Sequence, residues 1–365
     1  MSNKIQKRKD FNLKYPFVSI CTPTFNRRPF FPFIIKCFEN QTYPKNRMEW
    51  IIIDDGTDKI EDLVSHIPQI KYFKYNDKMF LGKKRNLMHE KSCGDIIVYM
   101  DDDDYYPPER VSHAVETLQQ NPKALCAGSS EMHIFFKHVN KMYKFGPYGP
   151  NHSTAATFAF KKELLLQTKY DDNAALAEER NFLKGYTIPF VQLDITKSIL
   201  VISHNHNSFD KKSLLNNPND KYVTVSNKIV DDFIKEKDLK QFFINDIDQL
   251  LNNYEPGKPE YKPDVLKQIE EIKIQRNQMI IDNNKKQIDN QNMMNTINQL
   301  FPNNEINQIL LNFQNKINEM NLIVHELTIE NNTLKEKTKY LENKITTIIQ
   351  NSIKQKKQIP LNGYT

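Results

Sequence analysis

Long apolar runs are absent from this sequence of 365 residues. No stretch approaches the roughly 18 consecutive apolar residues of a membrane-spanning helix. Residues 1–17, MSNKIQKRKDFNLKYPF, are basic but lack the apolar core of a secretory signal peptide. We therefore expect a protein with no transmembrane segment that resides in the cytoplasm, or in the host cytoplasm or virion if its source is viral.

Cysteine is also scarce, and charge of one sign is not concentrated. The four cysteines form no C-x-x-C pair, which excludes a zinc ribbon or a disulfide framework and predicts reduced, mostly buried thiols. The net charge of +6 is modest, and the lysines are spread along the chain without a strong stripe. We expect no nucleic-acid partner, whereas a phosphate-bearing substrate is compatible with this charge.

Glycine and proline are scarce in the second half. Seven of the nine glycines lie within the first 185 residues, and only two prolines follow Pro263. This change predicts that a turn-rich globular domain gives way to long helix. The expected parts are a basic tail at 1–15, a globular domain at 16–215, a helical connector at 216–300 and a coiled coil at 303–355.

A heptad pattern supports the coiled coil. Its d positions are apolar throughout: Phe313, Met320, Leu327, Leu334, Leu341 and Ile348. Its a positions are Leu310, Ile317, Val324, Asn331, Thr338 and Ile345. Asparagine at one a position is typical of a parallel two-stranded coil, so the pattern predicts a homodimer. The alternative is a single long helix folded back on the domain.

Short apolar runs alternate with helical patterns in the first half. The expected strands are 17–25, 48–57, 70–75 and 95–100, and the expected helices are 28–42, 83–94 and 108–122. The alternation predicts βαβ units, and thus an α/β, Rossmann-like, mostly parallel sheet flanked by helices. Pro23 is expected to end the first strand.

Polar or acidic residues follow three of these strands. Pro23 and Thr24 end the first, Asp54 and Asp55 the second, and four aspartates at 101–104 the fourth. In an open parallel sheet such ends face one crevice. Adjacent carboxylates repel one another, so the cluster predicts either a solvated turn or a bound cation.

Together, VSICTPTFNR, IIIDDGT, KKRN and GDIIVYMDDDDYYPPER resemble the inverting, family-2 type of nucleotide-sugar glycosyltransferase with the GT-A fold, over about residues 16–210. The resemblance implies a nucleotide-diphosphate donor, commonly a UDP-sugar, and Mn²⁺ or Mg²⁺. It also implies that Pro23 and Thr24 line the nucleotide pocket. The same match has Asp55 accepting a hydrogen bond from the base, Arg85 helping to bind the nucleotide and Asp102 near the ribose.

The resemblance implies that Asp103, with Asp101, faces the metal. On an extended chain these two side chains project to one side and Asp102 and Asp104 to the other, which would keep four charges from one site. Oxygen ligands suit Mg²⁺ and Mn²⁺. A late histidine is a metal ligand in some GT-A enzymes, and His204 is our candidate, with His206 as its substitute. Both histidines could equally be ordinary loop residues.

An inverting transferase needs a carboxylate that takes the acceptor proton. AEERNFLKGY resembles the acidic pair of the family, which implies Glu179 as the base and Glu178 as its neighbour. Helix N-terminal residues that favour the dipole are the alternative. Tyr105 and Tyr106 are candidates for stacking on sugar or base, or for packing under the sheet. His152 is a further candidate for substrate contact.

Three functions compete. The first is a metal-dependent inverting glycosyltransferase that moves a sugar to a hydroxyl of a glycan, protein or lipid-linked acceptor. The second is a catalytically inactive scaffold that oligomerises through its coiled coil. The third is phosphoryl or nucleotidyl transfer with two metals, which predicts a glycine-rich phosphate loop or a basic groove, and neither is evident in the sequence.

Overall fold

The computed structural model divides the chain into two compact units, Met1–Gln275 and Arg276–Thr365. It describes residues 11–176, 179–216 and 221–300, and then 308–309, 311–313, 315–324, 327, 330–331, 334, 338 and 345. The basic tail predicted at 1–15 and the coiled coil predicted at 303–355 therefore lie partly outside the described residues.

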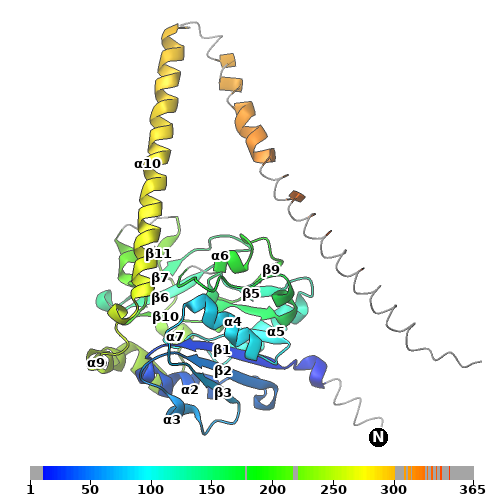
Figure 1. Cartoon of the computed structure of the whole chain (residues 1–365), viewed down its shortest axis with the longest axis vertical. Helices are drawn as coiled ribbons and strands as arrows, with labels where there is room; N and C mark the ends of the chain where they lie inside the picture. The colour runs from blue at the N-terminus through cyan, green and yellow to red at the C-terminus, as the bar shows by residue number, and fades with distance from the viewer. Residues whose placement is uncertain are drawn as a thin grey trace, which may run out of the picture. The chain divides into compact units, whose positions relative to one another are not determined.

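A seven-stranded mixed sheet forms the centre of the first unit (Figure 1), in the order β3-β2-β1-β4-β8-β5-β9. Its strands are β1 (Val18–Thr24), β2 (Met48–Asp54), β3 (Ile70–Lys74), β4 (Ile96–Tyr99), β5 (Cys126–Gly128), β8 (Ala159–Lys161) and β9 (Phe190–Gln192). Only β8 runs antiparallel to its neighbours. The predicted parallel-rich α/β sheet is thus confirmed. The direction in which successive strands are added to the sheet reverses between β1 and β4.

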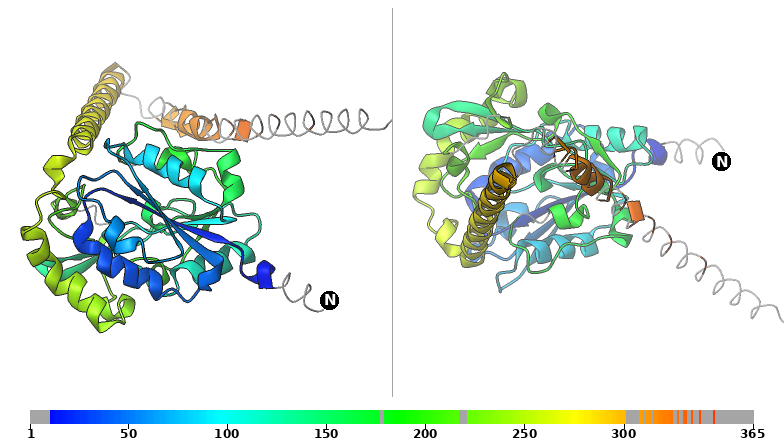
Figure 2. Two further views of the ribbon diagram at one scale, coloured as in Figure 1. Left: turned by 60° about the horizontal axis from the view of Figure 1, so that its bottom comes forward. Right: turned by 90° about the horizontal axis from the view of Figure 1, so that it is seen from above.

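Helices cover both faces of this sheet (Figure 2, left). They are α2 (Phe31–Glu39), α3 (Glu61–Val64), α4 (Leu81–Lys91) and α5 (Arg110–Gln120). Side chains alternate along each strand, so Ile52 packs in the core under α2 while Ile51 packs in the core under α4. Trp50 is fully buried and stacks on Phe38 of α2 at 4.8 Å.

Pro23 does not end the first strand as predicted, because β1 continues to Thr24. Met100 N donates to Cys21 O, so the backbone N–H and C=O groups of Cys21 point toward β4. The backbone groups of Pro23, two residues later, point the same way. The paired residues of β4 end opposite Cys21, and the missing N–H of Pro23 therefore leaves no ladder hydrogen bond unmade.

A second, four-stranded sheet adjoins the larger one and has no counterpart in the sequence-based prediction. Its order is β10-β6-β7-β11, with β6 (Met132–Phe136), β7 (Lys141–Phe145), β10 (Val201–Ser203) and β11 (Val223–Val225). Two of these strands have three residues each, too few for a period-two pattern to be recognised.

The compact unit also extends beyond the boundary predicted at residue 215. Three short helices follow β11: α7 (Val230–Phe233), α8 (Lys237–Gln241) and α9 (Ile247–Asn252). Phe242 is fully buried, and its ring stacks on Phe33 of α2 at 3.4 Å. The remaining helices are α6 (Glu179–Phe182) and α10 (Pro263–Leu300).

All four cysteines are free thiols; Cys21, Cys37 and Cys126 are buried and Cys93 is exposed. Across the described ranges, no helix combines the length and the apolarity needed to cross a bilayer.

Candidate functional site

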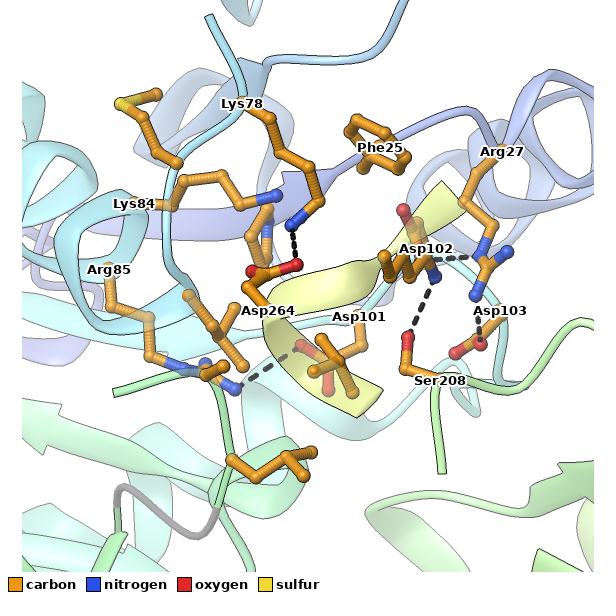
Figure 3. Close-up of a pocket in the computed structure, with 17 residues that line it drawn as sticks. Phe25, Arg27, Lys78, Lys84, Arg85, Asp101, Asp102, Asp103, Ser208 and Asp264 are labelled. Carbon is orange, nitrogen blue, oxygen red and sulfur yellow. Dashed lines mark hydrogen bonds and ion pairs between the residues drawn. The ribbon is translucent and has the colours of Figure 1, made fainter. Parts of the chain in front are cut away.

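A charged cleft lies at the carboxyl ends of β1 and β4, where the strand order of the larger sheet reverses. This is the switch point at which open α/β sheets bind ligands. The cavity volume is about 160 Å³. Figure 3 shows carboxylates and cations from distant parts of the chain converging on it. Its charged lining consists of Arg27, Lys78, Lys84, Arg85, Asp101, Asp102, Asp103, Lys262 and Asp264.

The aspartates at 101–104 do not alternate as predicted. Asp101, Asp102 and Asp103 all line the cleft, because β4 ends at Tyr99 and the chain bends through the following residues. Asp104 alone is directed elsewhere. It accepts a hydrogen bond from Ile202 N at 3.1 Å, and burial raises its pKa to about 7.

Arg27 joins two of these carboxylates. Its Nε lies 3.6 Å from Oδ1 of Asp102, and its Nη2 lies 3.4 Å from Oδ2 of Asp103. Burial raises the pKa of Asp102 to about 6, although Arg27 opposes this. Burial also acts to raise the pKa of Asp103, but the hydrogen bond of His204 and the charges of Lys211 and Arg27 hold it well below its usual value.

His204, rather than His206, meets the acidic segment. Its Nε2 lies 3.4 Å from Oδ2 of Asp103, and burial lowers its pKa to about 3. With metal–ligand bonds of about 2.1 Å at near-octahedral angles, two ligands of one ion lie roughly 3 Å apart. Asp103 and His204 are therefore close enough to share one divalent ion, but in this structure both ring nitrogens of His204 have other partners: Nδ1 accepts from His206 N at 3.2 Å, and Nε2 lies 2.8 Å from Nδ2 of Asn207. His206 turns instead toward Tyr254, and its carbonyl accepts from Arg27 at 2.7 Å.

No group of three or more histidine, cysteine or acidic side chains in the described part of the chain converges as a complete metal site. The candidate ligand pair would need further oxygen ligands. Mg²⁺ and Mn²⁺ are commonly held by one or two carboxylates plus substrate phosphates and water, so a partial protein ligand set has the expected chemistry.

Asp55 lies in the wall behind the cleft. Its carboxylate is buried and accepts from Lys84 Nζ at 2.8 Å and from Met79 N at 2.6 Å. It therefore holds a cleft lysine and fixes the loop that precedes α4. Arg85 is also buried, lies over the ring of Tyr99 at 4.4 Å and reaches Asp101 at 3.9 Å.

Pro23 lines the cleft directly, and Thr24 is buried at the end of β1. Glu179 is the first residue of α6, and Ala175 and Leu176 just before it line the cleft. Glu178 lies outside the described residues.

The remaining aromatic and histidine candidates lie apart from this lining. Tyr105 and Tyr106 are at most 1% exposed, so they pack in the core and cannot stack on a ligand. Tyr106 still serves the site, because its hydroxyl accepts from Asp101 N at 2.7 Å. His152 packs between Tyr148 and Tyr186 and is not among the cleft residues.

Sequence reasoning missed most of the basic lining. Arg27 and Lys84 stand inside quoted motifs, VSICTPTFNR and KKRN, which is the only signal that could have identified them. Lys78 and Lys262 stand in segments without a motif. The cleft is not a basic groove, because four carboxylates lie among its five cations, and the fold assembles these charges from separate segments.

Residues 19–172 match the model of glycosyl transferase family 2. An uncharacterized glycosyltransferase of Haemophilus influenzae is 26% identical over 215 residues, which cover 54% of this chain and 80% of the relative. The Campylobacter jejuni GalNAc(5)-diNAcBac-PP-undecaprenol beta-1,3-glucosyltransferase is 29% identical over 126 residues, covering 33% of this chain and 37% of that enzyme.

Among solved structures, Staphylococcus aureus TarS 1-349 aligns with a TM-score of 0.42 at 18% identity, over 51% of this chain and 60% of that one. The Pyrobaculum calidifontis mannosyltransferase PcManGT, solved with GDP-Man and Mn²⁺, aligns with a TM-score of 0.42 at 16% identity, over 51% of this chain and 56% of that one. The match to the family model and the names of the sequence relatives support a glycosyltransferase. The match spans only 37% of the length of the Campylobacter jejuni enzyme, and only 35% of a second uncharacterized glycosyltransferase of Haemophilus influenzae, which is 26% identical over 106 residues.

Proposed function

We propose that this glycosyltransferase is an inverting, metal-dependent enzyme that transfers a sugar from a nucleotide-diphosphate donor, a UDP-sugar, to a hydroxyl acceptor. The observation that carries the proposal is the charged cleft at the switch point. Five cations and four carboxylates line it. A diphosphate and a divalent ion would together match both signs of charge.

The first part of the proposal concerns the donor. Pro23 and Thr24 form the floor of the nucleotide pocket at the end of β1, and Asp102 lies near the ribose. Asp55 contacts the base only when its carboxylate leaves Lys84 or Met79 N, which it binds in this structure. Arg85 lies on the diphosphate side, beside Asp101.

The divalent ion, Mn²⁺ or Mg²⁺, would be held by Asp103 and His204, with Asp101 beside them. Bound there, it would supply positive charge to the departing nucleotide diphosphate. The Asp103 carboxyl is ionised at neutral pH, because His204, Lys211 and Arg27 hold its pKa well below its usual value despite burial, and a bound ion would share it with Arg27.

Glu179 is the proposed general base. It takes the proton of the acceptor hydroxyl as that oxygen attacks the anomeric carbon, and the bond to the diphosphate oxygen breaks on the opposite face. One displacement of this kind inverts the configuration. Glu179 itself is not among the residues that line the cleft, and the assignment is supported only by Ala175 and Leu176, which precede it and do line the cleft. Glu178, which is not described, is proposed as its neighbour.

The inactive-scaffold alternative is not favoured. Burying Lys262 costs free energy, because no carboxylate of the described residues lies within ion-pair distance of it, and a cleft that binds nothing would not recover that cost. The acceptor class is proposed only as a glycan, protein or lipid-linked hydroxyl.

A homodimer through the heptads remains part of the proposal. The apolar core positions that are described are half to two-thirds exposed: Phe313, Ile317, Met320, Val324, Leu327, Leu334 and Ile345. A partner helix would bury them. Light scattering should give a dimer for the full chain and a monomer for Leu327→Asp, while Glu319→Gln stays dimeric. A monomeric full chain contradicts the dimer.

The donor assignment is tested with a panel of UDP-, GDP- and dTDP-sugars in the presence of Mn²⁺, scored for slow hydrolysis. We expect nucleotide release from one or more UDP-sugars, and a loss of release on chelation. No release and no binding with any nucleotide sugar would favour the scaffold.

A further inference from the structure

A segment outside the family-matched region crosses the cleft. Residues 254–268, here called the strap, comprise a short 3₁₀ turn (Pro259–Tyr261) and the beginning of α10. In Figure 3 the ribbon that carries Asp264 passes across the cleft. The strap lies beyond residues 19–172, so the match to the family says nothing about its role.

The strap is attached to both sides of the cleft. On one side, Arg27 Nη1 donates to Gly257 O at 3.1 Å, and Asn26 Nδ2 donates to Pro256 O at 2.9 Å. On the other, Gln268 Oε1 accepts from Ala175 N at 2.8 Å. A side chain at Gly257 would come within 2.6 Å of the backbone oxygen of Asn26, so glycine allows this close docking.

Docking brings a buried cation into the cleft. Lys262 is only 6% exposed, and its ammonium donates to Ser208 Oγ at 2.7 Å. Among the residues that the structure describes, no carboxylate lies within ion-pair distance of this ammonium. Burial lowers its pKa and the charge of Arg27 acts in the same direction, whereas Asp102 and Asp103 oppose this from beyond ion-pair distance. Only an anion would compensate such a cation fully.

The strap also carries an anion. The carboxylate of Asp264 forms an ion pair with Lys78, from the loop before α4 (Figure 3). Asp264 therefore takes up one of the five cations that line the cleft. The cavity beneath, about 160 Å³, is smaller than the roughly 300–1,000 Å³ of typical small-molecule pockets. A nucleotide sugar would have to displace part of the strap.

We propose that Lys262 and Lys78 bind the diphosphate of the donor, and that the carboxylate of Asp264 holds Lys78 until the donor phosphate replaces it. This inference rests on the proposed function, because it presumes a nucleotide-diphosphate donor. Lys262 is then a donor-binding residue supplied from beyond the family-matched segment, and Asp264 is an internal competitor for the phosphate position.

The two residues should have opposite effects on affinity. Lys262→Met removes a charged hydrogen-bond donor, so UDP should bind at least about tenfold more weakly. Asp264→Asn removes the competing charge while keeping the shape, so UDP should bind a few-fold more tightly, as expected for a partly exposed ion pair. Lys267→Met, at an exposed lysine of the same helix, is the matched control and should bind UDP like the wild type.

The experiment is calorimetric titration of UDP with Mn²⁺ into the full-length proteins, with unfolding temperatures recorded for each variant. In a Lys78→Met background, Asp264→Asn should no longer tighten binding, because the competitor acts through Lys78. If Lys262→Met does not fold, this double-mutant comparison decides alone.

Two failures are distinguishable. A wild type that binds neither UDP nor GDP overturns the proposed function itself. A wild type that binds UDP, with Lys262→Met equal to Lys267→Met or with Asp264→Asn weaker than the wild type, overturns only the strap inference.

Discussion

The charges of the cleft and the charges of α10 beyond Asp264, which itself lines the cleft, are arranged in opposite ways. Arg27, Lys84 and Lys262 are at most 6% exposed. Along α10, Lys267 and Lys273 have side chains that are 78% and 65% exposed, and each lies near a glutamate one turn away. Both regions are rich in charge, but only the cleft keeps its charges out of water.

This difference distinguishes buried charges that can bind a ligand from exposed charges that keep a helix soluble. An exposed ion pair contributes about 0–1 kcal/mol, so the pairs on α10 keep the helix soluble and do little else. A buried charge costs several kcal/mol unless it is compensated. Carboxylates of the protein compensate Arg27 and Lys84, whereas the cost of burying Lys262 is offset only when an anion binds.

Glu179→Gln should reduce sugar transfer by about 10²–10⁴-fold, the usual contribution of a general base. UDP binding should not change, because the substitution keeps the size of the side chain. Transfer is measured by steady-state kinetics and binding by calorimetry. Glu163→Gln, at an exposed position, is the control. Normal transfer by Glu179→Gln would mean that the base lies elsewhere.

Asp103→Asn should weaken Mn²⁺-dependent binding of UDP by about 100-fold, since even loss of an outer-shell partner typically costs 10–100-fold in metal affinity. Titrations with and without Mn²⁺ check this, with Asp77→Asn in an exposed loop as control. Unchanged Mn²⁺ dependence would remove Asp103 from the metal site.

The first four strands and three main helices were predictable because each is a short, regular pattern bounded by turn residues. The run IIVYM before the aspartates can be read as a buried strand from its apolar continuity alone. Residues 221–253 were predicted only as part of a helical connector; their strand and their packing onto the globular unit were not predicted, because these elements are too short for periodicity. Phe242 shows its role only through the packing partner Phe33, which is far away in sequence.

The part of the site that could be predicted consists of residues adjacent in sequence. The aspartates at 101–104 stand in one run, whereas Lys78, Lys84 and Lys262 meet only after folding. The predicted alternation of these aspartates was wrong because it assumed an extended chain, and the strand ends before the first of them. Their partners, Arg27 and His204, determine which of them serve the cleft.

His89 is a buried titratable group outside the cleft, packed among aromatic rings, so it shows the cost of burial where no ligand binds. Burial lowers its pKa from about 6.5 to about 3. The neutral form therefore stabilises the fold fully above pH 6.5, and this contribution is lost as the pH falls toward 3. Between pH 7 and pH 5 the loss should be about 2 kcal/mol.

His89→Phe should flatten the dependence of unfolding free energy on pH in that window. It should also cost about 1 kcal/mol at pH 7, because the Tyr99 hydroxyl loses a partner at 2.6 Å. Denaturant unfolding at several pH values checks both effects, and His66→Gln, at an exposed residue, is the control. An unchanged pH slope in His89→Phe would contradict the assignment.

The smallest effect is expected on α10. Lys285 is exposed, so Lys285→Gln should change stability by less than about 0.5 kcal/mol and leave UDP affinity unchanged. Calorimetry and thermal unfolding measure both quantities. A loss of UDP affinity would show that the charges of α10 also bind, and the contrast between the two regions would no longer hold.

The most direct test of the account compares UDP with uridine in thermal unfolding of the full chain, with Mn²⁺ and then with a chelator. If the buried charges of the cleft exist to hold a diphosphate and an ion, UDP with Mn²⁺ raises the unfolding midpoint, while uridine does not and chelation abolishes the shift. Equal shifts from uridine and UDP, or no shift from either, would contradict it.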